Sequence, residues 1–375
     1  MVCARDSGLG THSSAMANIL DIRRRIRSVI NTRQITKAMK MVSAAKLRRA
    51  QERALAARPY AQMLTNILKS LVARAEIYDP ETGEPKHPLL AQRQENNILL
   101  IIVTGDKGLA GAFNANITKA ALRFLDSKQG KNIDIEAIGR KGRDFLRRRY
   151  PAAKVQTRSL AEVDESLDAR PEMGERSAAT QITGEHVGIL GKVEFSQAHR
   201  VAENVIERYE EEEIDAVYIV FNEFKSVIAQ RLVVEQILPI EKVGEQAVRQ
   251  TEEMTTEEKK RAKEAAVSAG VGLRPSDGAA DEVAAKFATA QVDYIYEQPP
   301  AELFRDLLPK YVAIQIFRAL MESVAAEHAA RMTAMDSATN NASDMIDSLT
   351  LVMNRARQAK ITKEIIEIVS GAAAM

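Results

Sequence analysis

The chain has 375 residues, of which 45% are hydrophobic and 28% are charged, and its formal net charge is +2. This composition is typical of a globular protein with room for about two domains. The longest aliphatic run, residues 98–103, has six residues, whereas a membrane-spanning helix needs roughly 20, so the sequence predicts no such helix. The one cysteine, Cys3, excludes an intrachain disulfide and a cysteine-ligated metal site and favours a reducing compartment.

Residues 1–15 precede the first strong structural pattern. They lack the apolar stretch of a secretory signal, and the run from Met16 to Leu20 resembles a more natural start. We expect residues 1–15 to be a disordered extension or the product of a misassigned start codon.

Residues 16–78 are predicted to form a first long helix. Residues 16–58 contain no proline or glycine and are rich in strong helix formers. Residues 17–58 carry twelve Lys or Arg against two acidic residues, a charge of +10. Such a helix implies an acidic partner, although composition alone also fits a nucleic-acid-binding helix, a membrane-surface helix or a solvated helix face.

Residues 298–375 are predicted to form a second long helix, because residues 310–370 also lack proline and glycine. The first 43 helical residues alone would span roughly 65 Å, about twice the diameter of a small domain, and such a helix needs a packing partner. Both segments show a spacing of three and four, which is the coiled-coil period. We expect an intramolecular antiparallel coiled coil, with an intermolecular one as the alternative.

Residues 79–240 are predicted to form an α/β body with a Rossmann-like, largely parallel sheet. A turn-rich linker over residues 79–88 leads into it. Aliphatic strand patterns then alternate with helical patterns, with a further strand or strand pair at residues 227–238. The expected strands are residues 97–104, 133–138 and 216–221, and the expected helices are residues 115–125, 140–149 and 193–213. Residues 241–297 read as an insertion, a charged helix followed by a flexible loop.

A glycine-rich segment containing Gly105, Gly108 and Gly111 lies between the first strand and the first helix of this body. A phosphate-binding loop occupies this place in nucleotide-binding folds. The spacing is GxxGxxG, however, and no Gly-Lys-Ser/Thr follows. We therefore expect a structural turn, with nucleotide binding as the weaker alternative.

No catalytic or metal-binding arrangement is visible in the sequence. The five histidines are separated by at least thirteen residues, and neither an HExxH nor a GxSxG pattern occurs. We expect no catalytic residue, no metal and no cofactor.

Three parts of the chain resemble the gamma subunit of the rotary ATP synthase. They are IRRRIRSVINTRQITKAMKMVSAAKL at residues 22–47, GDKGLAGAFN at residues 105–114, and the motifs AARM, ATNNA, NRARQAKITKEI and EIVSGA between residues 329 and 372. The resemblance covers both predicted helices and the body.

The resemblance implies a non-catalytic rotor subunit. The two helices would form a shaft inside a ring of three alpha and three beta subunits, and the body would contact the epsilon subunit and the membrane c-ring. Proton flow would turn the c-ring, and the shaft would drive each beta subunit through states of different nucleotide affinity. The protein would lie peripherally on the cytoplasmic face of the bacterial inner membrane. The competing hypothesis is a basic coiled-coil protein that binds nucleic acid.

The resemblance also implies residue roles near the end of the second helix. Arg357, Gln358 and Thr362 match positions that contact a catch loop of beta. A guanidinium there can make charge-assisted hydrogen bonds to a carboxylate.

In the first helix, Met39 with its neighbours Lys37 and Lys40 matches the segment that faces the acidic lever of beta. The alternative for Met39 is simple filling of the helix interface. The chain departs from the family by having Ala110 where a cysteine is common. It also lacks the cysteine pair of photosynthetic members near residues 241–290, which excludes thiol control there. Braking of rotation by the charged helix at residues 255–266 is a hypothesis.

Overall fold

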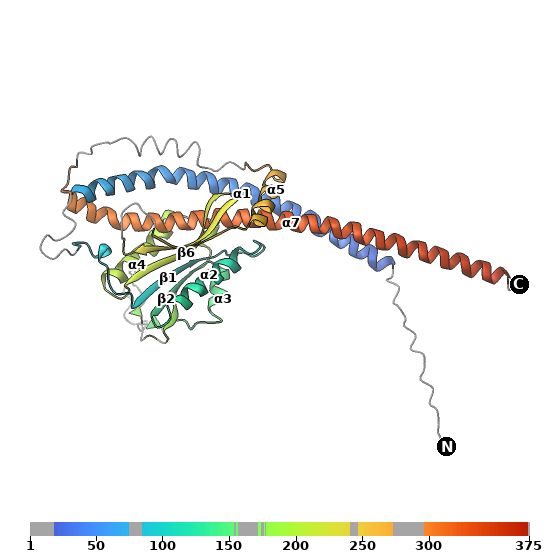
Figure 1. The fold of residues 1–375 in the computed structure, drawn as a ribbon, viewed down its shortest axis with the longest axis horizontal. Coiled ribbons are helices and arrows are strands. Elements are labelled where there is room, and N and C mark those ends of the chain that lie inside the picture. The colour runs from blue at the N-terminus through green and yellow to red at the C-terminus, as the bar shows by residue number, and fades with distance from the viewer. Residues whose placement is uncertain are drawn as a thin grey trace, which may run out of the picture. The chain divides into compact units, whose positions relative to one another are not determined.

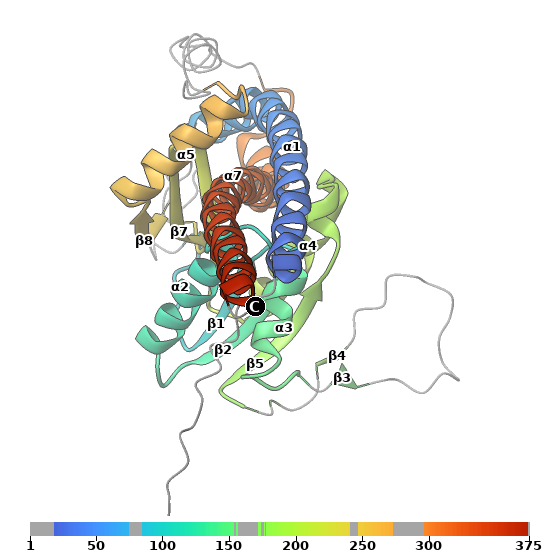
Figure 2. The ribbon, with the colours of Figure 1, turned by 90° about the vertical axis from the view of Figure 1, so that its right-hand side faces the viewer.

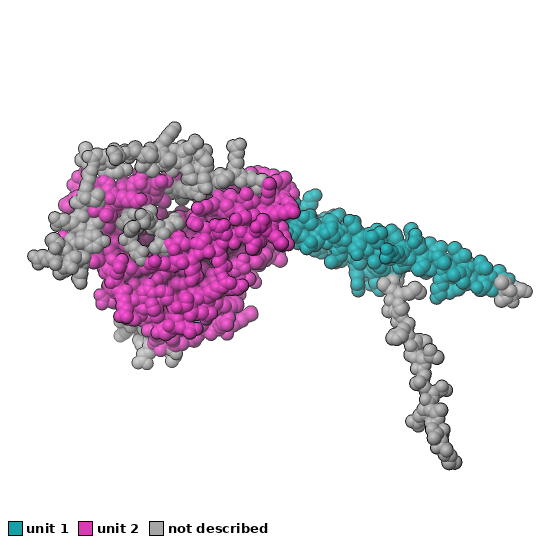
Figure 3. All heavy atoms as spheres, viewed as in Figure 1, with its two compact units in different colours: residues 1–40, 335–375 teal, residues 41–334 magenta. Residues whose placement is uncertain are grey.

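The computed structural model describes residues 19–74, 85–153, 155–156, 172–173, 176, 178–240, 247–272 and 296–373. The chain divides into two compact units (Figure 3). Unit 1 comprises residues 1–40 and 335–375, and unit 2 comprises residues 41–334. The extension expected at residues 1–15 lies outside the described residues. No helix in the described ranges is both long and apolar enough to span a bilayer.

Two long helices contain the first and last described residues. Helix α1 is Ile19–Arg74 and helix α7 is Pro300–Ala373. Pro300 stands at the first position of α7, where its missing N–H has no intrahelical partner to lose. Helix α1 continues through Pro59, although an internal proline costs about 3 kcal/mol. Buried leucines beyond that proline offset the cost, since each fully buried leucine contributes roughly 1.5–3 kcal/mol; they are Leu64, Leu68 and Leu71.

In unit 1 the two helices pair in antiparallel fashion. Lys40 Nζ donates to Asp336 Oδ1 at 2.9 Å, and Thr339 Oγ1 donates to Thr36 Oγ1 at 2.8 Å. The contact moves from residue 40 to residue 36 on α1 while it moves from residue 336 to residue 339 on α7. The two helices therefore run in opposite directions. This confirms the predicted intramolecular antiparallel pair.

The two predicted seams differ in burial. On α1 the positions spaced by three and four are all buried or half-buried, as expected; they are Ile19, Ile22, Ile26, Val29, Arg33 and Thr36. On α7 the seam is only partly covered, and residues 357–372 are all exposed. Since the described part of α1 begins at Ile19, this last part of α7 has no helix of the described chain beside it.

Unit 2 contains a six-stranded mixed sheet in the order β5-β2-β1-β6-β7-β8. Neighbours from β5 to β6 are parallel, and β6, β7 and β8 are antiparallel. This confirms the predicted α/β body with a largely parallel sheet. The strands are β1 Asn97–Val103, β2 Asn132–Ile138, β5 Thr180–His186, β6 Ala216–Ser226, β7 Ala229–Leu238 and β8 Ala247–Glu253.

Both edge strands of this sheet were missed by the sequence analysis. Strand β5 reads TQITGEH and β8 reads AVRQTEE, so neither has the apolar run of the central strands. Strand β8 lies in the predicted insertion, where the helix α5, Thr256–Ser268, agrees with expectation. Residues 241–246 and 273–295 of the predicted insertion lie outside the described residues. A two-stranded pair, β3 Val155–Gln156 and β4 Glu172–Met173, is separate from the main sheet.

Helices cover both faces of the sheet (Figures 1 and 2). One face packs with α2 (Phe113–Ser127), α3 (Arg140–Leu146), α5 and residues 44–50 of α1. The opposite face packs with α4 (Phe195–Glu210) and residues 64–71 of α1. Helix α7 takes part in both cores, with residues 304–320 on the α4 side and residues 325–332 on the α2 side. The sheet and α7 therefore share one continuous packed structure within unit 2.

Candidate functional site

The loop after β1 packs closely on α7. Asn114 Oδ1 accepts from Gly105 N at 2.8 Å, and Gly105 O accepts from Lys141 N at 3.1 Å. A Cβ at Gly105 would lie 2.7 Å from Glu327 Oε1, so any side chain there would force the Glu327 carboxylate to shift. Gly111 has φ +57°, in the left-handed region that favours glycine. The nearest atom to a Cβ at Gly108 is at 3.7 Å, so packing does not require glycine there.

A buried ion pair on α7 connects this helix to the loop. The Arg331 guanidinium donates to Glu327 Oε1 and, at 3.3 Å, to the carbonyl oxygen of Gly108. Burial raises the pKa of Glu327, although Arg331 and Lys46 oppose that rise. Arg331 therefore binds both the carboxylate of its own helix and the backbone of the loop. It thereby holds the loop and α7 together inside unit 2.

A second buried ion pair connects α7 to the sheet. Arg318 Nη2 donates to both carboxylate oxygens of Glu235 on β7, each at 2.7 Å. The guanidinium also lies 5.9 Å from the ring centroid of Phe221 on β6. Burial would lower the pKa of Arg318, but the carboxylates of Glu235 and Glu322 outweigh it and raise the pKa. Arg318 is therefore charged at every accessible pH.

The sequence analysis missed these four charged residues as a group. Arg331 was part of a quoted motif, and its partner lies one helical turn earlier, at the i,i+4 spacing typical of helix ion pairs. That spacing could have predicted the ion pair of Glu327 and Arg331 from the sequence. No local pattern indicates the second pair, since Glu235 and Arg318 are 83 residues apart.

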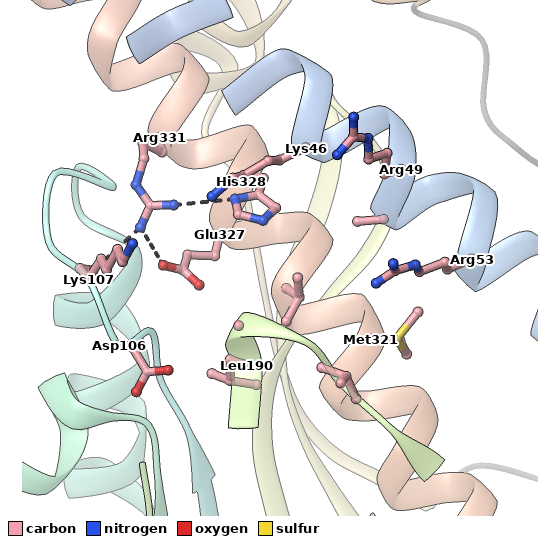
Figure 4. Close-up of a pocket in the computed structure, with 14 residues that line it drawn as sticks. Lys46, Arg49, Arg53, Asp106, Lys107, Leu190, Met321, Glu327, His328 and Arg331 are labelled. Atoms are coloured by element: carbon pink, nitrogen blue, oxygen red, sulfur yellow. Dashed lines mark hydrogen bonds and ion pairs between the residues drawn. The ribbon is translucent and has the colours of Figure 1, made fainter. Parts of the chain in front are cut away.

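A pocket of about 230 Å³ lies beside the first of these ion pairs (Figure 4). It is bounded by α1, α7, the loop after β1 and residues 190–193. Burial, together with the positive charges of Arg331, Lys46 and Lys107, lowers the pKa of His328 to about 4. This histidine is therefore neutral at pH 7. The charged and titratable lining residues are Lys46, Arg49, Arg53, Asp106, Lys107, Glu327, His328 and Arg331.

The predicted catch-loop residues lie on α7 in unit 1. Arg357, Gln358 and Thr362 are all exposed, and none makes a side-chain hydrogen bond or ion pair with another residue of the described ranges. Gln358 and Thr362 are four residues apart, so they lie on one face of the helix. These polar side chains are available to a partner.

The structure separates the three residues predicted to face the acidic lever. Lys37 is exposed and Met39 is half-buried, whereas Lys40 is buried between the helices. The Lys40 ammonium group pairs with Asp336 across the helix pair. Its charge therefore serves the pairing of α1 with α7, and Lys37 carries the exposed charge of this segment.

Among the described residues, no group of three or more His, Cys, Asp or Glu side chains is placed to hold a metal ion. The titratable groups of the pocket are instead mostly cationic.

The chain is similar to known proteins over nearly its whole length. The family profile described as "ATP synthase" matches residues 18–375. A protein named ATP synthase gamma chain from Solibacter usitatus (strain Ellin6076) is 47% identical over 359 residues, covering 96% of this chain and 99% of that protein. A protein of the same name from Geobacter sp. (strain M21) is 40% identical over 358 residues, covering 95% and 98%.

Among solved structures, a chain of the Euglena gracilis mitochondrial ATP synthase, described as OSCP/F1/c-ring in rotational state 3, is similar with a TM-score of 0.51. The match covers 95% of this chain and 94% of that chain at 18% identity. At this level of identity the likeness concerns the fold.

Proposed function

Since this chain belongs to the ATP synthase family and its curated relatives are gamma chains, we propose that it acts as the rotating central stalk of an ATP synthase. In this role it couples proton flow through a membrane c-ring to ATP synthesis or hydrolysis at beta subunits. The observation that carries the proposal is the 47% identity to a gamma chain across 96% of the sequence. The comparisons give no support to the nucleic-acid-binding alternative.

The geometry of α7 fits a part that transmits torque. Residues 304–332 of this helix pack on the sheet of unit 2, where Arg318 pairs with Glu235 of β7 and Arg331 donates to the carbonyl oxygen of Gly108. Residues 357–372 of the same helix are exposed. A torque applied to the sheet would reach this helix through the Arg318–Glu235 pair, the hydrogen bond from Arg331 to Gly108 and the packed side chains around them.

At the other end of α7, Arg357, Gln358 and Thr362 would make the contact with a catch loop of a beta subunit. Their exposure and their lack of partners within the described chain support this role. On α1, Lys37 and Met39 would face the acidic lever of beta. Lys40 would support that surface from within, through its ion pair with Asp336.

The orientation of such a shaft biases each beta subunit toward one of several states, which is coupling by differential contact. Catalysis then belongs to beta, and this chain contributes no catalytic group. We assign it, as partners, three alpha and three beta subunits, an epsilon subunit and a c-ring. Its place would be peripheral, on the cytoplasmic face of a bacterial inner membrane.

Affinity purification of the tagged chain from its own cells tests this proposal. We expect alpha, beta and epsilon subunits to copurify with it, and the complex to hydrolyse ATP while the isolated chain does not. Recovery of the chain without alpha and beta, or with bound nucleic acid, would contradict the proposal.

A further inference from the structure

The pocket beside the Glu327–Arg331 pair carries an excess of positive charge. Five of its lining residues are cationic and two are carboxylates. Both carboxylates already have donors: Glu327 is paired with Arg331, and Asp106 Oδ1 accepts from the backbone N–H groups of Arg140 and Gly188 at 3.0 and 3.2 Å. The excess of three positive charges therefore has no internal counter-charge at the pocket.

Four of the five cations have exposed side chains. Lys46, Arg49, Arg53 and Lys107 make no ion pair or side-chain hydrogen bond with the rest of the described chain. The first three lie at spacings of three and four on one face of α1, where like charges destabilise a helix. Figure 4 shows the side chains of Arg49 and Arg53 directed from α1 toward α7, and Lys46 reaching toward His328. An anion bound in the pocket would lower the repulsion among these like charges.

Size and charge limit what such an anion is. The volume of about 230 Å³ is below the roughly 300–1,000 Å³ of sites for drug-sized ligands. A single carboxylate would leave most of the charge uncompensated. A phosphate or pyrophosphate group carries two or more charges on several oxygens, and guanidinium groups bind such oxygens through two parallel hydrogen bonds.

We propose that this pocket binds a phosphate-bearing oxyanion, held by Arg49 and Arg53 from α1 and by Lys46 and Lys107. This site goes beyond the stalk function and does not depend on it. It also differs from a glycine-rich phosphate loop, since side-chain cations and not backbone N–H groups would make the contacts. The oxyanion is free phosphate, pyrophosphate or the phosphate tail of a nucleotide.

Calorimetric titration of the purified full-length chain at low ionic strength tests the proposal. The probes are inorganic phosphate, pyrophosphate and ATP, each without magnesium. We expect saturable binding of one ion per chain, weakened about tenfold or more by R49Q/R53Q, because each lost charge-assisted hydrogen bond contributes about 1.5–3 kcal/mol. If phosphate or pyrophosphate saturates the site, the free ion is the ligand. If ATP binds and the two free ions do not, the ligand is the phosphate tail of a nucleotide.

The matched control is R23Q/R27Q. These two arginines are exposed, lie on the same helix with the same spacing of four residues, and do not line the pocket. We expect R23Q/R27Q to bind as the unmodified chain does. Equal weakening in both double variants would show diffuse attraction to a basic helix and would overturn the site, as would the absence of saturable binding for all three probes.

His328 provides a second readout inside the pocket. Its charged neighbours are Arg331 and Glu327 on α7, Lys46 on α1 and Lys107 on the loop. Binding of the oxyanion should raise the NMR titration midpoint of His328 from about 4, because a nearby anion favours the imidazolium form. A titration midpoint of His328 that does not move at a saturating concentration of the probe would overturn the assignment. Tight binding of poly-glutamate without binding of the phosphate probes would also overturn it, because the occupant would then be an acidic polypeptide.

Discussion

At the scale of single residues, the exposed polar side chains near the end of α7 are the proposed point of coupling. The double substitution R357A/Q358A removes an exposed guanidinium and an exposed amide that make no hydrogen bond or ion pair with other described residues, so the free energy of unfolding and the assembly of the complex should change little. Loss of a charge-assisted hydrogen bond of about 1.5–3 kcal/mol to a beta subunit should slow ATP synthesis about tenfold or more. The measurement is proton-driven ATP synthesis in membrane vesicles, with subunit content determined by gel.

Arg355→Ala is the matched control for this substitution, since Arg355 is an exposed cation two residues away that is outside the predicted contact. It should leave synthesis unchanged. Normal synthesis by the assembled double variant would remove the proposed role of Arg357 and Gln358.

Another prediction at this scale concerns the pH dependence of stability through His328. Its pKa is about 4 in the folded chain and 6.5 in the unfolded chain, so the unfolded chain binds an extra proton between these values. The free energy of unfolding therefore has its full value above pH 6.5 and falls as the pH is lowered toward 4. The total decrease from this one group is at most about 3 kcal/mol. Urea unfolding in phosphate-free buffer should show this loss, and His328→Gln should reduce the slope. An equal slope in the variant would assign the pH dependence to other groups.

At the scale of elements, the connection of α7 to the sheet is expected to dominate the stability of unit 2. Glu235→Gln removes the carboxylate from the buried pair and leaves the Arg318 charge without compensation from this partner, which costs about 3–5 kcal/mol. The exposed pair of Arg123 and Glu252 serves as the control, because Glu252→Gln should cost about 1 kcal/mol or less. Denaturant unfolding of the two variants gives the comparison, and equal effects would show that the buried pair is not a structural connection.

The helix α5 is a second element with a testable role. Its buried alanines, among them Ala265, belong to the core that also contains Leu47 of α1, and the Arg48 side chain donates to the carbonyl oxygen of Gly270 just after α5. If this helix brakes rotation, Ala265→Glu should release it and raise the rate of ATP hydrolysis by the complex. Val267→Glu adds the same charge at an exposed position and should have no effect. Unchanged rates in both variants would remove the braking hypothesis.

At the scale of the whole molecule, the antiparallel pairing of the terminal helices is the feature on which the rotor hypothesis depends. Thr36 and Thr339 place their Oγ1 atoms 2.8 Å apart, so cysteines at both positions, with Cys3 replaced by serine, should form an intramolecular disulfide on oxidation. The locked complex should still hydrolyse ATP at its normal rate, because both helices belong to one rotor and turn together. Non-reducing gels and activity assays check this. Disulfide-linked dimers would instead support an intermolecular coiled coil.

The sequence by itself determined the two terminal helices, the central strands of a largely parallel sheet and the insertion helix. These features are encoded by residues close together in the chain, such as the aliphatic run of β1 and the proline-free stretches of α1 and α7. The sequence motifs in residues 22–47 and 329–372 were also specific enough to indicate the family.

Only the tertiary structure decided the rest. The edge strands β5 and β8 have polar sequences, and their strand form comes from hydrogen bonds to β2 and β7. Lys37 and Lys40 look alike in sequence, yet only the approach of α7 buries Lys40 against Asp336. The cationic pocket likewise needs α1, α7 and the loop after β1, which are far apart in the chain. Burial and electrostatic pairing depend on which distant segments meet, and local periodicity does not carry that information.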